Sequence, residues 1–180
     1  MRPRADRIIW MATRTQGLIV MPGNPKEIVE IADLASPEVR FINRQRDSGT
    51  RILLDQLLAE VGVAPAEVRG YESEEYTHSA VAVHVASGLA DVGLGIEAAA
   101  AQFKLGFVPL VAEQYFFAVR SDALQRPAVQ AFITLLGSEP FRRIVNGLPG
   151  YRADRSGEVA EIADTAPWNE LLAAPSTGPA

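Results

Sequence analysis

The sequence predicts an α/β protein in which helices cover a parallel or mixed β-sheet. Two observations support this fold class. The chain has 180 residues, of which 48% are hydrophobic and 22% charged, a composition typical of a globular protein with a sizeable core. Between residues 40 and 111, a strand, a loop and a helix recur three times and are followed by a further strand. This recurrence is typical of a parallel sheet with covering helices.

The first part of the chain is predicted to hold two strands and two helices. The run GLIVM at residues 17–21 is β-rich and ends at the turn sequence PGNP, after which a short helix is expected over residues 25–35. A second strand is expected over residues 40–43. Leucines spaced by four residues then predict an amphipathic helix that begins near Ser48 and ends at Gly62.

The remaining elements follow from the same signals. The segment at 80–87 is apolar nearly all round, so it predicts a buried helix, with His84 as a core histidine and Gly88 as its end. Residues from about 164 onward are rich in Ala, Pro, Ser and Thr and are expected to be a flexible tail. Further strands are predicted at 68–71, 91–94, 107–111 and 114–119, and further helices at 96–105, 127–136 and 139–145.

Three loops are expected to meet at one edge of the predicted sheet. The sequences RQRDSGT, ESEEYTHS and GIE each follow a predicted strand and precede a predicted helix. In parallel sheets, ligands gather beyond the carboxyl ends of the strands, where such loops lie. The sequence therefore predicts that any binding site lies at these loops.

The first of these loops carries a surplus of arginines at a helix start, where acidic residues are usually favoured. The residues concerned are Arg44, Arg46 and Arg51, which surround Ser48, Gly49 and Thr50. One interpretation is purely structural. Ser48 or Asp47 caps the helix, and the arginines are solvated or paired with acids such as Asp55.

The alternative interpretation of the same loop is an anion site. An oxyanion would accept hydrogen bonds from the backbone N–H groups of Gly49 and Thr50 and from the hydroxyls of Ser48 and Thr50. Arg44 or Arg51 would neutralise its charge. Gly49 suits this role because a residue without a side chain lets a ligand approach the backbone closely.

The second loop places Thr77 and His78 at another helix start, where they are either a helix cap and a surface histidine or part of the same site. Glu74, Glu75 and His78 have a spacing that could bring them together on a helix. They offer too few ligands for a tight metal site, so no metal or cofactor is expected.

Several classes of function are excluded by the sequence. A net charge of −5 argues against direct nucleic-acid binding. There is no run of about 18 apolar residues that could cross a membrane. The basic N-terminus is interrupted by Arg14 to Gln16 before it becomes a signal peptide, so a cytoplasmic protein is expected. No phosphate-binding loop, dinucleotide fingerprint or nucleophile elbow is present, so no enzyme activity is expected.

Five segments together resemble the periplasmic-binding-protein-like (PBP superfamily) domain related to molybdate- and tungstate-binding proteins. They run from about Arg14 to Gly157 and read TRTQGLIVMPGNPKEI, DLASPEVRFINRQRDSGTRILLDQLL, GYESEEYTHSAVAVHVASGLADVGLGIEAAA, FVPLVAEQYFFAV and FRRIVNGLPGY. Such domains are typically cytoplasmic and are found fused to helix-turn-helix segments or to molybdopterin-biosynthesis enzymes. The SGTR element is also similar to the effector domain of LysR-type regulators.

The resemblance implies a type II periplasmic-binding-protein-like fold, with two α/β lobes and a ligand held in the cleft between them. Residues 22–112 would form one complete lobe that carries the anion-binding loops. Residues 1–21 plus 113–163 would supply the crossover strands and the remainder of the other lobe, and 164–180 the tail. This first lobe looks truncated relative to the family. Its exposed apolar faces therefore predict a homo-oligomer.

Carried onto this sequence, the resemblance assigns the ligand-binding residues to Arg44, Ser48, Gly49, Thr50, Arg51, Thr77, His78 and Tyr115. The function it implies is a non-catalytic sensor or carrier domain for a small oxyanion, molybdate or tungstate. The alternative is a ligand-free regulatory or dimerisation module of a transcriptional regulator. In that case a DNA-binding or enzyme partner domain would lie on another chain.

Overall fold

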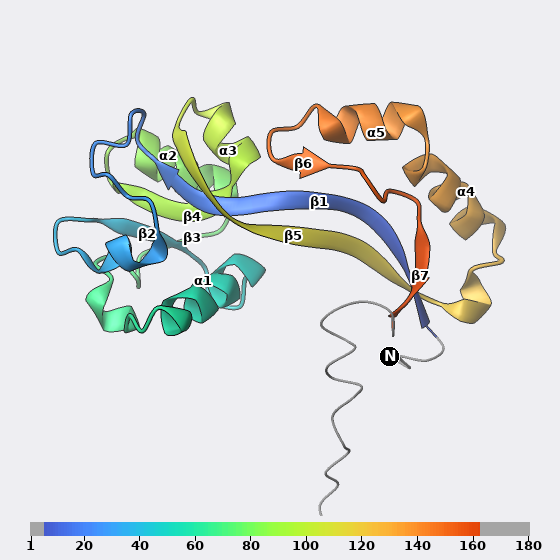
Figure 1. The fold of residues 1–180 in the computed structure, drawn as a ribbon, viewed down its shortest axis with the longest axis horizontal. Helices are drawn as coiled ribbons and strands as arrows, with labels where there is room; N and C mark the ends of the chain where they lie inside the picture. Colours follow the sequence, from blue (N-terminus) through green and yellow to red (C-terminus); the bar gives the residue numbers. More distant parts are fainter. Residues whose placement is uncertain (1–5, 163–180) are drawn as a thin grey trace, which may run out of the picture. The chain divides into compact units, whose positions relative to one another are not determined.

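The computed structural model describes residues 6–162, which form two compact units (Figure 1). Unit 2 comprises Arg14–Glu113, and the described part of unit 1 comprises residues 6–13 and 114–162. Two long strands, β1 (Asp6–Val20) and β5 (Gly106–Arg120), contribute to both units. The predicted tail at 164–180 lies outside the described residues.

The sheet of unit 2 is mixed, which confirms the predicted fold class. Its strand order is β3-β2-β4-β1-β5. Strand β2 pairs in parallel with both β3 and β4, whereas β4 pairs antiparallel with β1, with Leu18 opposite Leu94. The strands not yet bounded are β2 (Phe41–Arg44), β3 (Glu74–Glu75) and β4 (Val92–Ile96).

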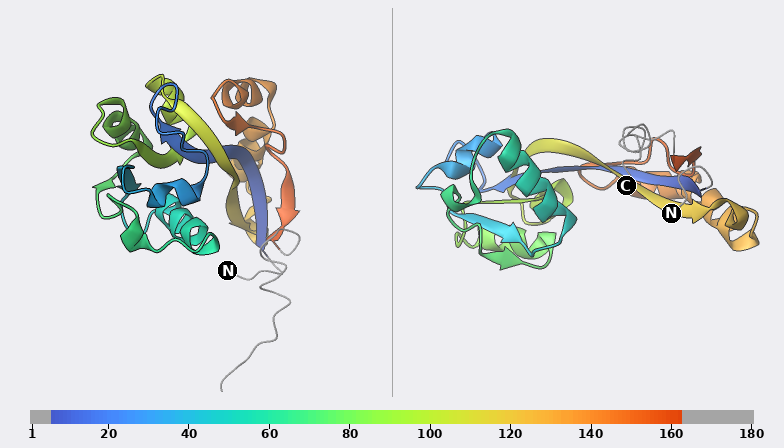
Figure 2. Two further views of the ribbon diagram at one scale, coloured as in Figure 1. Left: turned by 60° about the vertical axis from the view of Figure 1, so that its left-hand side comes forward. Right: turned by 90° about the horizontal axis from the view of Figure 1, so that it is seen from below.

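Helices cover both faces of this sheet (Figures 1 and 2). Successive strand residues point to opposite faces. Leu18 and Phe41 therefore join the core beneath α1, whereas Ile19 and Ile42 join the core beneath α2 and α3. The helical segments of unit 2 are η1 (Ile31–Ala35), α1 (Gly49–Glu60), η2 (Pro65–Glu67), α2 (His78–Ala86) and α3 (Glu97–Gln102).

The boundary of unit 2 differs from the predicted lobe of residues 22–112. Leu18 and Val20 of β1 are fully buried in the core of unit 2, so the unit begins at Arg14, ahead of the predicted start. The last residue of the unit is Glu113. The reason for the difference is that β1 is a continuous strand of 15 residues, longer than the apolar run GLIVM indicates.

Two predicted elements of unit 2 are wrong. The helix expected over 25–35 is reduced to η1, because Asn24 folds its own chain into turns. Its side-chain amide exchanges two hydrogen bonds with the backbone of Ile28, and Asn24 and Glu27 both have positive φ. The strand expected at 68–71 is a turn, with Gly70 at φ 98°, and the strand occurs later, at β3.

Helix α2 is buried on one side only, contrary to the prediction. Val81 and Val85 are fully buried against the sheet, whereas Val83 is 46% exposed. Close packing of α2 on the sheet depends on Gly93, where a Cβ atom would lie 2.4 Å from Val81 Cγ1. His84 is not a core histidine. Its Nδ1 lies 3.3 Å from Glu75 Oε1 on a partly exposed surface.

Unit 1 combines the outer halves of β1 and β5 with two helices and two short strands that pair with β1. The strands predicted at 107–111 and 114–119 are one continuous strand, β5. Residues 114–118 of this strand are all exposed. None of the helices in residues 6–162 has the length and apolar character needed to cross a bilayer. The elements are η3 (Ser121–Ala123), α4 (Pro127–Leu136), α5 (Glu139–Asn146), β6 (Tyr151–Arg152) and β7 (Val159–Glu161).

Candidate functional site

The carboxyl ends of β2, β3 and β4 lie at one edge of the sheet in unit 2, because the three strands are parallel. Helices α1, α2 and α3 begin shortly after these strands (Figure 1). This confirms the predicted meeting of three strand-to-helix loops. The first two helices are long enough to present a useful N-terminal dipole, whereas α3 has only 6 residues.

Ser48 is the cap of α1, and its Oγ accepts a hydrogen bond from the backbone N–H of Arg51 at 3.1 Å. Asp47, the other predicted cap, is exposed and has φ 66°. At Gly49, a Cβ atom would meet nothing within 4 Å. The side-chain position of Gly49 therefore faces open space, and the first N–H groups of α1 have no partner within the helix.

Thr50 belongs to a buried polar chain that also includes residues of β1 and β5. Its Oγ1 donates a hydrogen bond to Gln16 Oε1 at 2.9 Å, and both residues are almost fully buried. Gln16 Nε2 donates in turn to Glu113 Oε2 at 3.1 Å, and Arg14 Nε donates to the same oxygen at 2.6 Å. The hydroxyl hydrogen of Thr50 is thus bound within the protein.

The three arginines of the first loop occupy different environments. Arg51 is buried, lies 3.2 Å from Glu74 Oε1 and 3.3 Å from Asp55 Oδ1, and stacks its guanidinium over the ring of Tyr71. Arg46 is exposed and pairs with Glu72. For these two arginines the structural interpretation of the loop holds, including the predicted pair of Arg51 with Asp55.

Arg44 differs from the other two because its guanidinium contacts only neutral acceptors. It donates to the backbone carbonyls of Glu75 and Tyr76 at 3.2 and 3.0 Å and to the side chain of Gln45. No carboxylate within residues 6–162 lies at ion-pair distance from it. Burial, followed by the charge of Arg14, lowers the pKa of Arg44 below its usual value. Arg44 therefore carries a positive charge that a ligand could neutralise.

His78 begins α2 directly after Thr77, the cap, whose Oγ1 accepts a hydrogen bond from Ala80 N at 3.0 Å. The imidazole Nδ1 is buried near Gly95 of β4 and has no hydrogen-bond partner among residues 6–162. Burial, followed by the charges of Arg44 and Arg14, lowers the pKa of His78 to about 4. His78 is therefore neutral at physiological pH and adds no charge to the two arginines.

The low pKa of His78 predicts how stability depends on pH. Below about pH 6.5 the unfolded chain binds a proton at this residue that the folded protein resists. Stability should therefore fall as the pH drops from about 6.5 to about 4, by at most about 3 kcal/mol, and change no further below that. Urea unfolding of His78→Gln should lack this component, whereas His84→Gln should keep it. Parallel curves for the parent and His78→Gln would contradict the assignment.

Tyr115 belongs to unit 1 and is not among the residues that unit 2 brings together. It lies on β5 and is 36% exposed. The residues that cluster in unit 2 are Arg44, Ser48, Gly49, Thr50, Thr77 and His78, with Arg14 and Glu113 interacting beside them.

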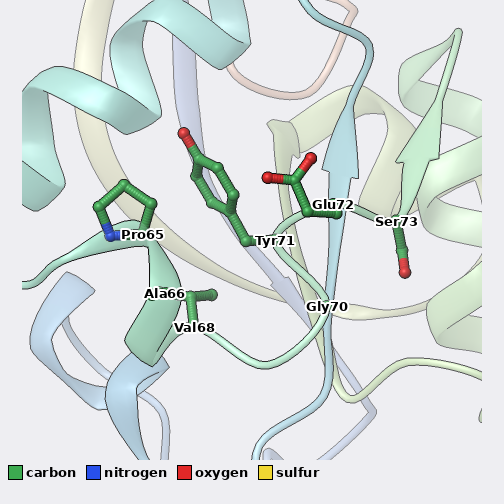
Figure 3. Close-up of a pocket in the computed structure, with 7 residues that line it drawn as sticks. All are labelled: Pro65, Ala66, Val68, Gly70, Tyr71, Glu72 and Ser73. Atoms are coloured by element: carbon green, nitrogen blue, oxygen red, sulfur yellow. The ribbon is translucent and has the colours of Figure 1, made fainter.

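A separate hollow of about 630 Å³ lies in unit 2 after α1 (Figure 3). Its lining includes the ring of Tyr71, which stands between Pro65 and Glu72. The hydroxyl of Tyr71 donates to Asp55 at 2.6 Å, so this polar group is already satisfied. None of the predicted site residues lines the hollow, which consists of Pro65, Ala66, Val68, Gly70, Tyr71, Glu72 and Ser73.

Sequence reasoning missed Arg14, Gln16 and Glu113. Arg14 and Gln16 interrupt an apolar strand, and Glu113 lies between two apolar runs of another. Polar residues inside apolar strands signal either a bulge or a buried polar contact, and this signal was available. The pairing of Arg14 with Glu113 could not be predicted, because the two residues are 99 positions apart in the sequence.

The cluster offers hydrogen-bond donors and positive charge. Within residues 6–162 no set of three or more His, Asp or Glu side chains is placed to hold a metal ion. Serine and threonine hydroxyls, two helix N-termini and an arginine without a carboxylate partner are the groups that hold anions.

Residues 2–137 match a family described as a PBP superfamily domain. The uncharacterised protein YvgK of Bacillus subtilis (strain 168) is 39% identical over 152 residues, which cover 84% of this chain and 49% of YvgK. An uncharacterised protein from the 5′ region of a 2Fe-2S ferredoxin gene of Clostridium pasteurianum is 32% identical over 109 residues, covering 60% of this chain and 96% of that protein. This chain thus spans about half the length of YvgK.

Solved structures show the same fold at low sequence identity. A substrate-binding domain assigned to a molybdenum ABC transporter of Clostridium difficile has a TM-score of 0.60 and 18% identity, covering 81% of this chain and 66% of its own. PEB3 bound to L-phospholactate has a TM-score of 0.52 and 20% identity, covering 81% and 68%. The amino acid-binding protein AbpA of Streptococcus pneumoniae, bound to L-arginine, has a TM-score of 0.54 and 16% identity, covering 81% and 62%.

Proposed function

Because this chain belongs to the PBP superfamily domain family, we propose that its unit 2 binds a small oxyanion of the molybdate or tungstate class. A substrate-binding-protein-like fold suggests a small ligand, and the solved structures include binders of molybdenum, phospholactate and arginine. The observation that carries the choice of an anion is Arg44, a partly buried arginine without a carboxylate partner in the described part of the chain.

The surroundings of Arg44 support an anionic ligand. The first turn of α1 faces open space at Gly49, and the hydroxyl of Ser48 can still donate its hydrogen while its oxygen caps the helix. An oxyanion there would receive charge-assisted hydrogen bonds, which are roughly twice as strong as neutral ones. It would also interact favourably with the positive ends of the helix dipoles.

We propose that the domain serves as a sensor or carrier and performs no reaction of its own. The matched family and the solved structures named above are binding proteins rather than enzymes. A cytoplasmic location and a DNA-binding or enzyme partner on another chain form part of the same proposal.

Calorimetric titration tests the proposal directly. The purified chain would be titrated with molybdate, tungstate, sulfate and phosphate at low ionic strength, since salt screens exposed charges. Saturable heat with at least one of these anions supports the proposal. Absence of heat and of any shift in melting temperature with all of them would overturn it.

Gly49 provides a further prediction about how the ligand approaches. Gly49→Ala should leave the stability unchanged or raise it by up to about 0.5 kcal/mol, because the added methyl group meets no protein atom and alanine favours a helix. The same methyl group should weaken anion binding about tenfold by filling the space over the first turn. Calorimetry and thermal unfolding of this variant check both effects. Unchanged affinity would place the anion elsewhere.

A second candidate function is a ligand-free dimerisation module, and one observation favours it. In unit 1, Tyr115 and Phe117 share one face of β5 and are 36% and 42% exposed, and Phe116, on the other face, is 36% exposed. Exposed aromatic side chains often mark an interaction surface. Sedimentation of the chain in the presence and absence of anions separates the two functions. A dimer that binds no anion would favour the second.

A further inference from the structure

The half of β5 that belongs to unit 1 forms an edge of the sheet. Among residues 6–162, β5 pairs with β1 alone, which puts β5 at the end of the strand order (Figure 1). Edge strands offer backbone N–H and C=O groups to a further strand that approaches. Residues 114–119 of this half read QYFFAV, with no charged residue and no proline, and residues 114–118 are all exposed.

The other edge strands carry the features that normally prevent further pairing, namely short length, charge or proline. Strands β3 and β6 have two residues each, and both residues of β3 are acidic. Strand β7 has three residues and ends at Glu161, which pairs with Arg7. The half of β5 in unit 2 contains Pro109, which has no N–H to donate. In the described part of the chain, residues 114–119 are thus the one edge segment without such protection.

Aromatic side chains lie on both faces of this edge and are held in place by the protein. Phe116 packs edge-to-face on Trp10 of β1, with ring centroids 5.6 Å apart, and Phe117 packs in the same way on Phe132 of α4 at 4.9 Å. Even so, Phe116 and Phe117 remain 36% and 42% exposed. Side chains that are already fixed lose little conformational freedom on binding. The edge is therefore preformed for contact on both faces.

We propose that this half of β5 pairs antiparallel with β5 of a second copy of the chain, with Phe116 directly opposite its own counterpart. Opposite side chains in antiparallel strands lie on the same face, so a two-fold axis between two copies must fall at a residue position. At Phe116, the axis brings the two Phe116 rings together on one face. On the other face it brings Tyr115 of each copy opposite Phe117 of the other.

This self-complementarity is the reason for choosing a second copy as the partner. An axis shifted to Phe117 would place Phe116 opposite Ala118 and Tyr115 opposite Val119, so one aromatic pair would remain. Cross-strand aromatic pairs are among those that stabilise antiparallel strands. With the axis at Phe116, residues 114–118 also bring no charged side chain opposite another.

The expected dimer is a weak one, and it goes beyond the proposed function. Stable interfaces bury at least about 1,000 Å² in total, and one short strand pair with three aromatic side chains from each copy lies at the low end of this scale. Dissociation in the micromolar range is therefore expected. The pairing residues belong to unit 1 and the anion site to unit 2, so dimerisation and anion binding are measured separately.

Single cysteines test the pairing and its register, because the chain has no cysteine of its own. Gln114 of one copy lies opposite Ala118 of the other in this register, and both residues are exposed. A mixture of Gln114→Cys and Ala118→Cys chains should give at least tenfold more disulfide-linked dimer on mild oxidation than either variant alone. Each of these residues lies about 14 Å from its own counterpart, whereas a disulfide needs Cα atoms within about 7 Å.

The matched control is Val159→Cys, an exposed position on β7, the short strand that pairs with the same β1. Mixed with Gln114→Cys or Ala118→Cys, it should give no more linked dimer than the single variants do. Should Gln114→Cys or Ala118→Cys fail to fold, Phe116→Cys replaces the mixture, because this residue faces its own counterpart and should link to itself.

Sedimentation equilibrium of the parent over the micromolar range completes the test. A concentration-dependent dimer, together with selective linkage in the mixture, supports the inference. A parent that is monomeric at every concentration overturns it, and would mean that β5 is covered by residues outside 6–162 or by a different protein. Equal linkage in the mixture and in the single variants overturns it as well. In each case the proposed function stands or falls by the anion titration alone.

Discussion

Replacement of Arg44 with methionine is expected to weaken oxyanion binding at least about 100-fold while the protein remains folded. Arg44 is the arginine of the first loop whose guanidinium reaches only neutral acceptors, so its charge remains available for a ligand. Loss of a charge-assisted, two-pronged contact to a desolvated anion costs more than loss of a neutral hydrogen bond. The fold loses three side-chain hydrogen bonds, those to the carbonyls of Glu75 and Tyr76 and the one to the side chain of Gln45. Calorimetry with tungstate measures the effect.

Arg46→Met is the matched control for this experiment. Arg46 belongs to the same loop, but it is exposed and paired with Glu72. Its removal should change the affinity less than about threefold, through long-range attraction alone. Equal losses in the two variants would mean that the loop attracts anions by its general charge and that Arg44 has no special role.

Replacement of Arg51 with methionine is expected to destabilise the protein by about 2 kcal/mol, the larger structural effect among the three arginines. The side chain of Arg51 is 6% exposed and joins Glu74 of β3 to Asp55 of α1. Its loss would leave two carboxylates without their partner and would remove the stacking over Tyr71. The estimate lies below that for a fully buried ion pair because Asp55 is 46% exposed.

Urea unfolding at neutral pH measures this destabilisation. Arg46→Met again serves as the control, since exposed ion pairs contribute at most about 1 kcal/mol. Little change in Arg51→Met, or an equal change in both variants, would contradict the structural role assigned to Arg51. Anion affinity measured on folded Arg51→Met should fall much less than that of Arg44→Met, because Arg51 already has carboxylate partners within the protein.

The edge of the sheet that carries the candidate site could be predicted from the sequence, because the three strand-to-helix loops there depend on local patterns. A strand followed by a polar loop and a capped helix is recognisable from periodicity and from residues such as Ser48 and Thr77. Three such strand-loop-helix segments in succession predict parallel strands whose carboxyl ends lie at the same edge of the sheet. The roles of the individual arginines could not be assigned in the same way, because each depends on partners distant in the sequence.

The misplaced third strand explains part of this gap. A strand at 68–71 would leave Glu74 in a free loop, whereas β3 pairs Glu74 with Asn43 and brings it to Arg51. The apolar Val68 made the earlier segment look like a strand, but Gly70 has positive φ and a Cβ there would lie 2.1 Å from the carbonyl oxygen of Phe41. The backbone conformation at Gly70 therefore outweighed the β-propensity of the segment, which is a weak and context-dependent signal.

The lost helix at 25–35 has a similar cause. Pro25 and the acidic residues after it favour a helix start, but the side chain of Asn24 binds the backbone of Ile28 and turns the chain first. The pairing of β1 with β4 and β5 could not be read from spacing either, since neighbours in this sheet come from opposite ends of unit 2.

The contact of Arg14 with Glu113 also shows where the chain enters and leaves unit 2. These are the first and last residues of unit 2, and their side chains meet at 2.6 Å. The chain thus enters and leaves this unit through neighbouring strands, with 98 residues between the two ends. A unit with adjoining ends can be added to or removed from a host at little cost in loop-closure entropy. The connectivity is therefore that of an inserted module, and the ion pair between Arg14 and Glu113 holds its two ends together.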